Sequence, residues 1–438
     1  MNDEQRSQQK DTPFYEEPSG GWGSLKGLLR TLKTEQPEPG VIDTLRRQNK
    51  PEGHMCTSCA WAKPASPHRF EFCENGAKAT IWDLTEDRCT PEFFAEHSVE
   101  ELKSWSDHEL ELAGRLTHPL RYDADTDHYV ACSWGDAFAG IGENLKALEP
   151  ESVVFYTSGR ASLETSYLWA LFARLYGHNN LPDSSNMCHE TTSVGLKQVI
   201  GSPVGTCVLE DFEHCDMILF FGQNTGSNSP RFLHPLQEAA RRGCHIVTFN
   251  PVRERGLIEF ADPQNPLQML TGSTTPLSEI YLQVKPGGDI AALLGLCKRV
   301  FELEDERGEV IDRRFIDEHT DGFDDFERFA RETDWQTIEN ESGLTRADLI
   351  EVGDLYAGSE RVIGIYGMGL TQHVHGSQSI AMYVNLLLMR GNIGKQGAGI
   401  SPVRGHSNVQ GQRTVGISEK PELVPLDKLA ELLDFEPP

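Results

Sequence analysis

The chain has 438 residues, 38% of them apolar, which is enough for roughly two to four domains with a large core. Its 40 basic and 67 acidic residues give a net charge of −27, a field that repels phosphate backbones and anionic membranes, so neither nucleic acid nor a membrane is an expected partner. No apolar run approaches the roughly 20 residues that span a bilayer, and no signal peptide is evident. We therefore expect a cytoplasmic protein with reduced thiols.

The N-terminal part of the chain is polar and rich in turns. Residues 1–50 are expected to form a polar extension, of which 1–20 are disordered and GGWGSLKGLLRTL (20–32) indicates a short amphipathic helix. QPEPG at 36–40 ends that helix. Apolar residues are scattered between 51 and 120, which is typical of a small domain that needs a metal for stability.

Three cysteines in that domain have the spacing of a metal or cluster site. Cys56 and Cys59 form a C-x2-C pair, and Cys73 follows 14 residues later. Two thiolates at this spacing can reach one metal ion or one cluster, so zinc and iron–sulfur are both open, as are three unligated thiols. A fourth ligand is not evident: His68, Cys89 or none would complete the set.

From about residue 150, short apolar runs alternate with helical patterns. Strands are expected at 152–159, 216–224, 245–251, 279–289 and 361–369, and helices at 164–177, 234–244 and 290–302. This alternation predicts an α/β fold of doubly wound parallel sheets, with enough units for two of them.

The ends of the expected strands share a composition. They read YTSGR, FFGQN, FNPVR, KPGGD and YGMGLTQ. Ligands of doubly wound sheets bind beyond the carboxyl ends of the strands, where backbone N–H groups can bind phosphate without lysine. One such end is an ordinary turn, but five of them predict a large, phosphate-bearing ligand that is held from several sides.

A Cys–His pair lies within NMCHETTSVG at 186–195. The preceding DSSN is an N-cap signal that places Cys188 near a helix N-terminus, where the pKa of a thiol is lowered. A thiolate is a nucleophile or a soft metal ligand, and His189 could move a proton, although an isolated pair of this kind is more often structural. The other cysteines are expected to be small core residues: Cys132, Cys207, Cys215, Cys244 and Cys297.

Several longer motifs occur together, in a fixed order. They are CTSCAW with FEFCENGAKA, RLTHPLRYD, NMCHETTSVGL, FFGQNTGSNSP, GMGLTQ and MRGNIGKQGAGISPVRGHSNVQG. In these motifs the chain resembles the molybdopterin oxidoreductases from about residue 50 to 418, specifically the catalytic subunits of formate dehydrogenases and a less characterised branch beside them.

The resemblance implies a fold and a set of cofactors. A small iron–sulfur domain (51–120) would precede two doubly wound, mainly parallel-sheet domains: a discontinuous molybdopterin-binding domain (121–186 plus 364–438) and a dinucleotide-binding domain (187–363). The implied cofactors are molybdenum or tungsten in a bis-molybdopterin guanine dinucleotide, and a [4Fe-4S] cluster.

The resemblance also implies roles for individual residues. Cys188 would bind the molybdenum, His189 would assist proton transfer, and Arg404 would hold an anionic substrate. Cys56, Cys59 and Cys73 would bind the cluster. The cofactor-binding positions would be Lys78, Gly222, Gln223, Asn224, Asn250, Arg253, Asp289, Gly367, Met368, Gly369 and Gln372. The implied reaction is the two-electron oxidation of formate or a similar small anion, with electrons leaving through the cluster to an acceptor protein.

Two departures from the family pattern leave a second function open. Lys63 occupies the place of a third closely spaced cysteine, and the chain stops at FEPP, where relatives continue into a β-rich domain. The expectation is therefore a fragment of such an enzyme, an enzyme whose missing domain comes from a separate polypeptide, or a truncated, non-catalytic cofactor-binding or assembly subunit.

Overall fold

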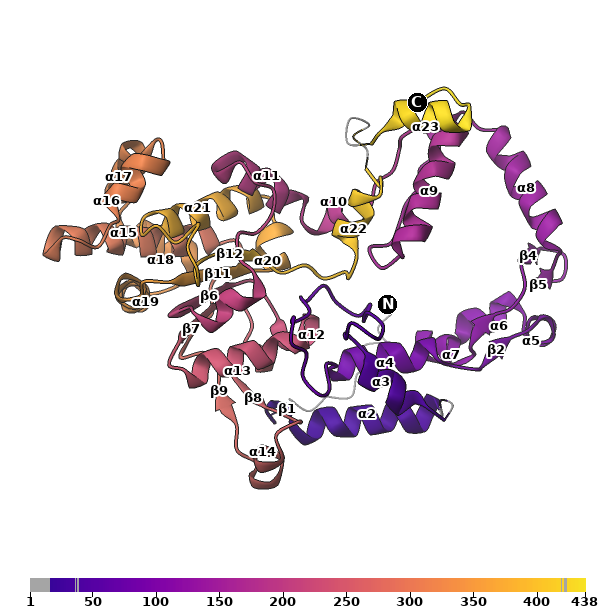
Figure 1. Ribbon diagram of the computed structural model, residues 1–438, viewed down its shortest axis with the longest axis horizontal. Coiled ribbons are helices and arrows are strands. Elements are labelled where there is room, and N and C mark those ends of the chain that lie inside the picture. Colours follow the sequence, from indigo (N-terminus) through magenta and orange to yellow (C-terminus); the bar gives the residue numbers. More distant parts are fainter. Residues whose placement is uncertain (1–15, 36, 38, 419, 421–423) are drawn as a thin grey trace.

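The computed structural model describes residues 16–35, 37, 39–418, 420 and 424–438, so the prediction for 1–20 falls mainly outside the described residues. A parallel five-stranded sheet lies at its centre, in the order β10-β7-β6-β11-β12 (Figure 1). Its strands are β6 (Met217–Phe221), β7 (His245–Phe249), β10 (Ile280–Leu282), β11 (Val362–Tyr366) and β12 (Gly399–Pro402). The expected α/β class with a parallel sheet is confirmed.

Strand β6 shows why the sheet forms here. All five residues of its MILFF sequence are buried, because both faces of the sheet are covered. Leu219 and Phe221 contribute to one hydrophobic core, whereas Ile218 and Phe220 contribute to the core on the opposite face. A continuous apolar run is therefore what this position in the sheet requires.

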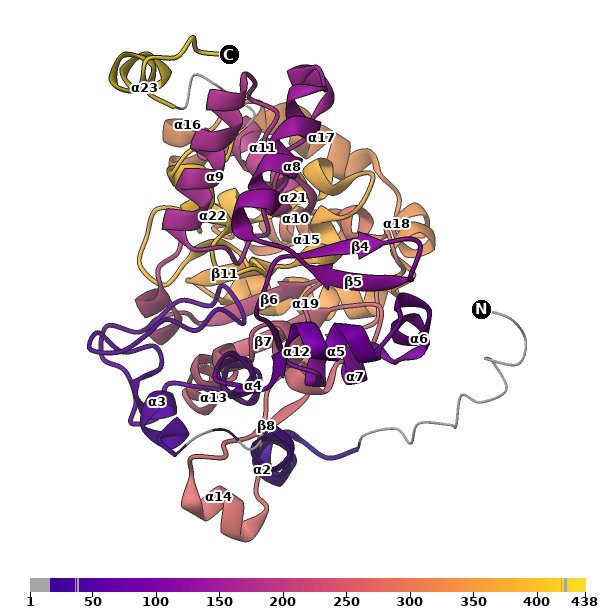
Figure 2. The same cartoon turned by 90° about the vertical axis from the view of Figure 1, so that its right-hand side faces the viewer.

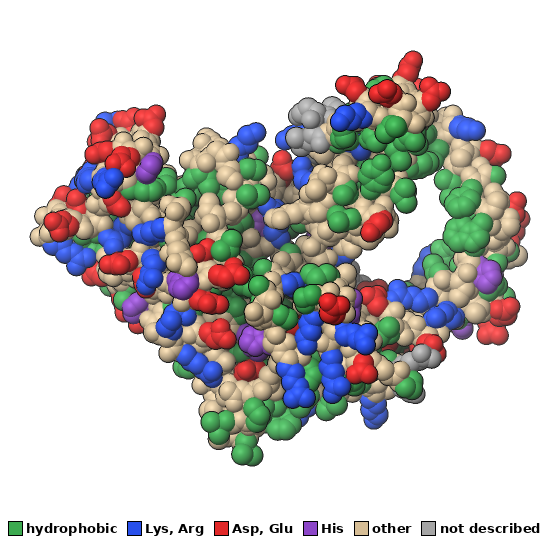
Figure 3. Space-filling view, viewed as in Figure 1, with side chains coloured by type: hydrophobic (Ala, Val, Ile, Leu, Met, Phe, Trp, Pro, Cys, Tyr) green, Lys and Arg blue, Asp and Glu red, His purple; other side chains and the backbone are tan. Residues whose placement is uncertain are grey.

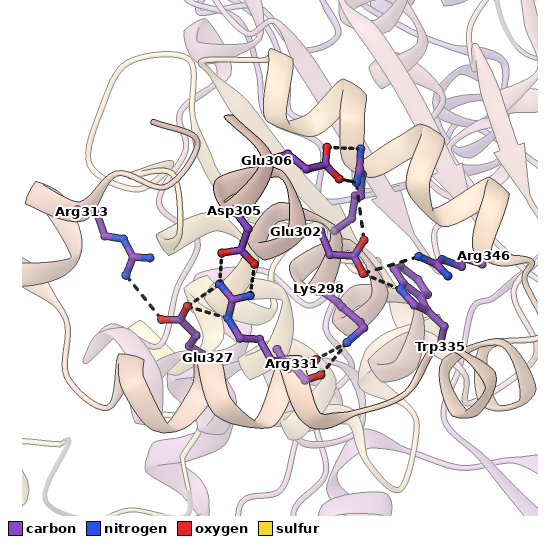
Figure 4. Close-up of polar contacts among 11 residues, drawn as sticks. Lys298, Glu302, Asp305, Glu306, Arg313, Glu327, Arg331, Trp335 and Arg346 are labelled. Atoms are coloured by element: carbon purple, nitrogen blue, oxygen red, sulfur yellow. Dashed lines mark hydrogen bonds and ion pairs between the residues drawn. The ribbon is translucent and has the colours of Figure 1, made fainter. Parts of the chain in front are cut away.

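Helices cover the first face of the sheet. They are α11 (Glu190–Ile200), α15 (Asp289–Arg307), α16 (Arg313–His319), α17 (Phe323–Glu332), α18 (Trp335–Ser342), α19 (Arg346–Gly358), α20 (Met368–Thr371) and α21 (Gly376–Leu388). Figure 4 shows the polar contacts that hold α17 and α18 to α15: Arg331 pairs with Asp305 at 2.6 Å, and the Trp335 indole donates to Glu302 at 2.8 Å.

The second face is covered by α13 and by shorter elements. These are η2 (Leu209–Glu213), α12 (Thr225–Asn228), η3 (Pro230–Phe232), α13 (Leu233–Arg241), η4 (Arg255–Leu257), β8 (Glu259–Ala261), α14 (Pro266–Thr271) and β9 (Thr275–Pro276). Strands β8 and β9 form a small sheet with β1 (Ser19–Gly20), which leads into α2 (Gly21–Glu35). The amphipathic helix expected at 20–32 is thereby confirmed.

The cysteine-bearing segment lies beside this second face and is made of short elements. They are α3 (Val41–Arg47), α4 (Glu74–Asp83), β2 (Arg88–Cys89), α5 (Pro91–Glu96), α6 (Val99–Ser104), α7 (Asp107–Leu112) and β3 (Arg115–Leu116). Figure 2 shows α5–α7 and the following hairpin, β4 (Leu120–Asp123) with β5 (His128–Ala131), on the side that faces the viewer.

Residues 120–183, here called the arm, extend away from the sheet and return to it (Figure 1). After β4 and β5 the arm contains α8 (Trp134–Lys146), η1 (Pro150–Ser152) and α9 (Leu163–Tyr176). The buried Arg174 of α9 donates to the carbonyl of Gly416 at 2.8 Å, which ties the arm to the C-terminal segment. That segment carries α22 (Val409–Thr414) and α23 (Leu426–Leu433), while α10 (Ser184–Cys188) leads from the arm back to the sheet.

The strand expected at 152–159 forms no ladder with another strand. Its one pairing among the described residues is an isolated bridge between Thr157 and Asp183. Phe155 is 3% exposed, whereas its neighbours Val154 and Tyr156 are 57% and 49% exposed. The exposure of its side chains thus alternates as in a half-buried strand. The segment nevertheless lies outside the five-stranded parallel sheet, so it has no neighbouring strand of that sheet to pair with.

Candidate active site

The carboxyl ends of the central strands lie at one edge of the sheet because the strands are parallel. The backbone N–H of Gly369 after β11 donates to the carbonyl of Gly222 after β6 at 3.0 Å. A Cβ on Gly222 would lie 2.7 Å from Gly369 Cα, and one on Gly367 would lie 2.0 Å from Gln223 Oε1. Glycine is therefore required at this crossing, and side chains are kept out of it.

The next two strand ends carry polar groups at the same edge. The backbone N–H of Asn250 after β7 donates to Leu282 of β10, and the Arg253 guanidinium lies 5.5 Å from the Tyr281 ring centroid. Asp289, the first residue of α15, is buried, and this burial raises the pKa of its carboxyl to about 6.

Two neighbouring predicted residues differ in what their side chains do. Asn224 caps α12, since its Oδ1 accepts from the backbone N–H of Ser227 at 3.2 Å. Gln223 is 5% exposed, and its Nε2 has no hydrogen-bond partner among the described residues. A buried donor without a partner is costly, which indicates a site that a ligand would complete.

Cys188 is the last residue of α10, whose N-cap is Asp183, so the predicted cap is present but the cysteine lies at the other end of this short helix. The next residue, His189, is the N-cap of α11. The Cys188 thiol lies 3.6 Å from Met368 Sδ, and the Thr371 hydroxyl donates to the Cys188 carbonyl at 2.9 Å. The loop after β11 therefore fixes the position of Cys188.

Gln372 adds a further bond between the same two segments. Its Nε2 donates to the carbonyl of Met187 at 3.1 Å. Together with Met368, this predicted cofactor-binding residue thus contacts the cysteine-bearing helix in the described structure.

His189 is fully buried and fixed through both ring nitrogens. Its Nε2 lies 3.1 Å from the Val403 carbonyl, which can only accept, so Nε2 carries the hydrogen. Its Nδ1 then accepts from the Thr192 hydroxyl at 2.7 Å, and Thr192 in turn accepts from the Tyr366 hydroxyl at 3.1 Å. Burial, with the nearby Arg404 charge, lowers the pKa of His189 to about 3, so the ring is neutral at neutral pH.

Arg404 follows β12, the strand next to β11, and this adjacency brings it to Cys188 and His189. The Cys188 and Arg404 side chains are close enough to interact electrostatically, although burial lowers the pKa of the guanidinium. Arg404 lines a cavity of about 440 Å³ with His406 and Ser407. Arg404 Nε, His406 Nδ1 and Ser407 Oγ are buried and have no hydrogen-bond partner among the described residues.

The three cysteines of the N-terminal motif also come together. A Cβ on Gly76 would lie 3.0 Å from Cys56 Sγ and 3.7 Å from Cys73 Sγ, so this glycine leaves room beside both sulfurs. Burial, together with the charges of Cys59 and Cys56, raises the pKa of the Cys73 thiol to about 11. In the described part of the chain, no three His, Cys, Asp or Glu side chains are arranged to hold a single metal ion.

The remaining candidates in this segment lie elsewhere. The Cys89 thiol donates to the carbonyl of Ala113 at 3.2 Å, and the His68 ring lies 6.1 Å from that of His234. Lys78 on α4 forms an ion pair with Glu74 at 2.7 Å.

A buried ion pair that the sequence did not reveal joins the cysteine segment to the sheet. Glu71 and Arg231 have side chains that are 4% and 7% exposed, and Arg231 Nε lies 2.9 Å from Glu71 Oε1. The Arg231 charge is one of the groups that act on the Cys73 thiol, whose pKa it lowers. The sequence does not reveal this pair, because each residue taken alone is indistinguishable from an ordinary charged surface residue.

A glycine-lined sheet edge and buried polar atoms without hydrogen-bond partners among the described residues mark an α/β protein with room for a large polar group at the carboxyl ends of its strands. The chain belongs to the molybdopterin oxidoreductase family, whose model matches residues 115–424. It is 48% identical to protein YdeP of Escherichia coli (strain K12) over 435 residues, 98% of this chain and 57% of that protein.

Two further proteins are similar over part of the chain. The F420-dependent formate dehydrogenase subunit alpha of Methanocaldococcus jannaschii is 30% identical over 303 residues, 69% of this chain and 41% of that protein. Acetylene hydratase from Pelobacter acetylenicus has the same fold, with a TM-score of 0.52 and 19% identity over 65% of this chain and 36% of that chain. The chain thus spans little more than half the length of the curated relatives that it matches.

The residues present fit a molybdenum- or tungsten-pterin group. Such a group offers many hydrogen-bonding atoms, and the unpartnered buried polar atoms of Gln223, Arg404, His406 and Ser407 need partners. The donor set also suits it, because a cysteine sulfur is a soft ligand for the metal. In the part of the chain that the structure describes, no helix is long and apolar enough to cross a membrane.

Proposed function

We propose that this protein oxidises formate or a similarly small anion by two electrons at a molybdenum- or tungsten-pterin centre. The observation that carries the proposal is the convergence of two segments far apart in the sequence at the glycine-lined edge of the sheet: Cys188 lies 3.6 Å from Met368 Sδ, and the next residue, His189, bonds to the Val403 carbonyl beside Arg404. A cytoplasmic location remains a prediction from the sequence.

Each residue of the centre has a role that follows from its chemistry. When bound, the metal–pterin group supplies the capacity to accept two electrons. The Cys188 sulfur is the protein's ligand to the metal, held in place by Met368 and Thr371. The Arg404 guanidinium binds the substrate carboxylate, because its fork of N–H donors matches two oxygens.

His189 has a different role from the proton transfer that its sequence position suggested. Because its Nε2 hydrogen is held by Val403 and its Nδ1 is occupied by Thr192, neither nitrogen is available to a substrate in this arrangement. We assign to His189 the positioning of the Val403 main chain, and hence of Arg404 beside it.

The strand ends would hold the cofactor as a bis-molybdopterin guanine dinucleotide. Gly222, Gly367 and Gly369 let the cofactor approach the backbone, and Gln223 donates to it. Asp289, a buried carboxylate, would accept from the N–H groups of guanine, with Asn250 and Arg253 beside it. The cluster would be [4Fe-4S], held by Cys56, Cys59 and Cys73, with Lys78 between it and the pterin.

The exposed apolar side chains of the arm favour a further polypeptide as a partner of this chain. Phe138 and Leu168 on α8 and α9 are 65% and 62% exposed, and Figure 3 shows apolar side chains around an opening between the arm and the cysteine-bearing segment. Such a patch marks an interaction surface. We propose that it is covered by a segment that corresponds to the part of the longer relatives that this chain does not span.

Formate-dependent reduction of a dye by anaerobically purified protein, together with this covering polypeptide, tests the function. We expect turnover in the wild type, and loss of turnover with retention of the pterin in Cys188→Ser. Pterin without turnover in the wild type, with a range of small anions, would instead favour the non-catalytic cofactor-binding or assembly subunit.

A further inference from the structure

Two cysteines face each other at the edge of the sheet opposite the candidate active site. Cys215 and Cys244 lie just before β6 and β7, which are neighbouring parallel strands paired with Met217 opposite His245. Their sulfur atoms are 3.7 Å apart. The expectation that both are small core residues is confirmed, since both belong to the hydrophobic core on the second face of the sheet, and the strand register also brings their thiols together.

The surroundings of the pair distinguish the two thiols. The two thiols are hydrogen-bonded to each other, and this bond lowers the pKa of Cys215 while raising that of Cys244. The Arg242 guanidinium, 3.9 Å from Cys215 Sγ, also lowers the pKa of Cys215, whereas Asp216 opposes it and is itself paired with Arg361. Cys215 is thus the better thiolate, with Cys244 as its proton-donating neighbour.

A small molecule can approach this pair through a surface cavity. The cavity has a volume of about 370 Å³ and is lined by both cysteines, Arg242 and Arg361. Cys215 is 2% and Cys244 8% exposed, so the sulfurs are shielded from bulky reagents. Its lining also includes Glu213 and Asp216, and such a small cavity of mixed charge suits a small, uncharged, polar oxidant.

We propose that Cys215 and Cys244 are a redox-active dithiol that a hydroperoxide converts reversibly to a disulfide. The Cys215 thiolate attacks the peroxide oxygen, the O–O bond breaks, and the protonated leaving oxygen departs as water or an alcohol, which leaves a sulfenic acid. The Cys244 sulfur then attacks Cys215 Sγ, the sulfenic hydroxyl leaves as water, and the disulfide forms. The two thiols lose two electrons and the peroxide gains them.

The site is independent of the proposed function, because it lies at the amino ends of β6 and β7. Mass spectrometry tests it on the full chain, purified anaerobically and treated with limited hydrogen peroxide before denaturation in excess N-ethylmaleimide. We expect a peptide pair linked through Cys215 and Cys244 that dithiothreitol separates. Cys297, which is fully buried on α15, is the internal control and should be alkylated as a free thiol.

Single variants show the order of the steps. Cys244→Ser should leave Cys215 as a sulfenic acid that dimedone labels, whereas Cys215→Ser should leave Cys244 unlabelled. Recovery of both cysteines as free thiols in the wild type, under conditions in which peroxide has oxidised other cysteines, would overturn the proposal. So would disulfides that join either one only to a third cysteine.

Discussion

Phe220 in the sheet is fully buried, whereas Phe138 on α8 of the arm is 65% exposed. The sheet satisfies its apolar residues within the described chain, because helices pack on both of its faces. The arm buries a small core around Phe155 and leaves a broad apolar face exposed (Figure 3). The sheet therefore buries its apolar surface within the described chain, whereas the arm leaves an apolar surface that we propose a partner covers.

The largest expected effect is in the sheet. Phe220→Ala removes a ring that is packed between β6 and α13 and should lower the free energy of unfolding by about 3–5 kcal/mol, through lost burial and a residual cavity. Urea denaturation of the chain measures this change. A loss below about 1 kcal/mol would mean that the sheet is not the stable body described here.

Arg404→Lys tests the site where the last strand of the sheet meets the cysteine-bearing helix. Lysine keeps the charge but lacks the bidentate fork, so substrate binding should weaken by about 2–4 kcal/mol. The change should appear mainly in KM, measured by steady-state kinetics with formate or the small anion that the enzyme oxidises. An equal fall in kcat with an unchanged KM would contradict a binding role for Arg404.

Asp289→Asn tests the buried carboxyl at the sheet edge. Because burial raises the folded-state pKa of Asp289 to about 6, its contribution to stability is complete below pH 4 and is lost as pH rises through about 6. The variant should therefore be more stable than the wild type at pH 7, by roughly 2–3 kcal/mol in the cofactor-free chain, and equal to it near pH 4. Thermal unfolding across this pH range checks the prediction, and an equal difference at both ends would refute it.

The smallest expected effect is in the arm. Phe138→Ala removes an exposed ring and should change the free energy of unfolding of the chain by less than about 0.5 kcal/mol. The same variant should weaken binding of the covering polypeptide, measured by co-purification. Unchanged binding would show that the arm is not part of the proposed interface. Phe220→Ala is the matched phenylalanine-to-alanine substitution in the central sheet.

Local patterns were sufficient to predict much of the fold. MILFF is a continuous apolar run and HIVTF is rich in β-branched and aromatic residues; both end in turns and form β6 and β7. The segment 152–159 looked equally strand-like, but no neighbouring strand pairs with it in the described residues. Conversely, β12 (Gly399–Pro402) escaped prediction, because its GISP sequence is short and weak and is stabilised by its partner β11.

The candidate site was likewise predicted in part and missed in part. Cys188 and Arg404 were predicted because they lie in motifs that resemble those of the molybdopterin oxidoreductases. Thr192 and Tyr366, which fix His189, were missed, although Thr192 follows His189 by one helical turn and Tyr366 ends β11. The Glu71–Arg231 pair could not be found from sequence, since only the folded chain buries both groups.

We propose above that the glycine-lined edge beside Cys188 and Arg404 holds a molybdenum- or tungsten-pterin group. The most direct measurement is the metal and pterin content of protein purified anaerobically, together with its covering polypeptide, from cells that make the cofactor. Elemental analysis should find molybdenum or tungsten close to one atom per chain, and acid oxidation should release a fluorescent pterin. Protein that is folded and paired but contains neither metal nor pterin would contradict the claim.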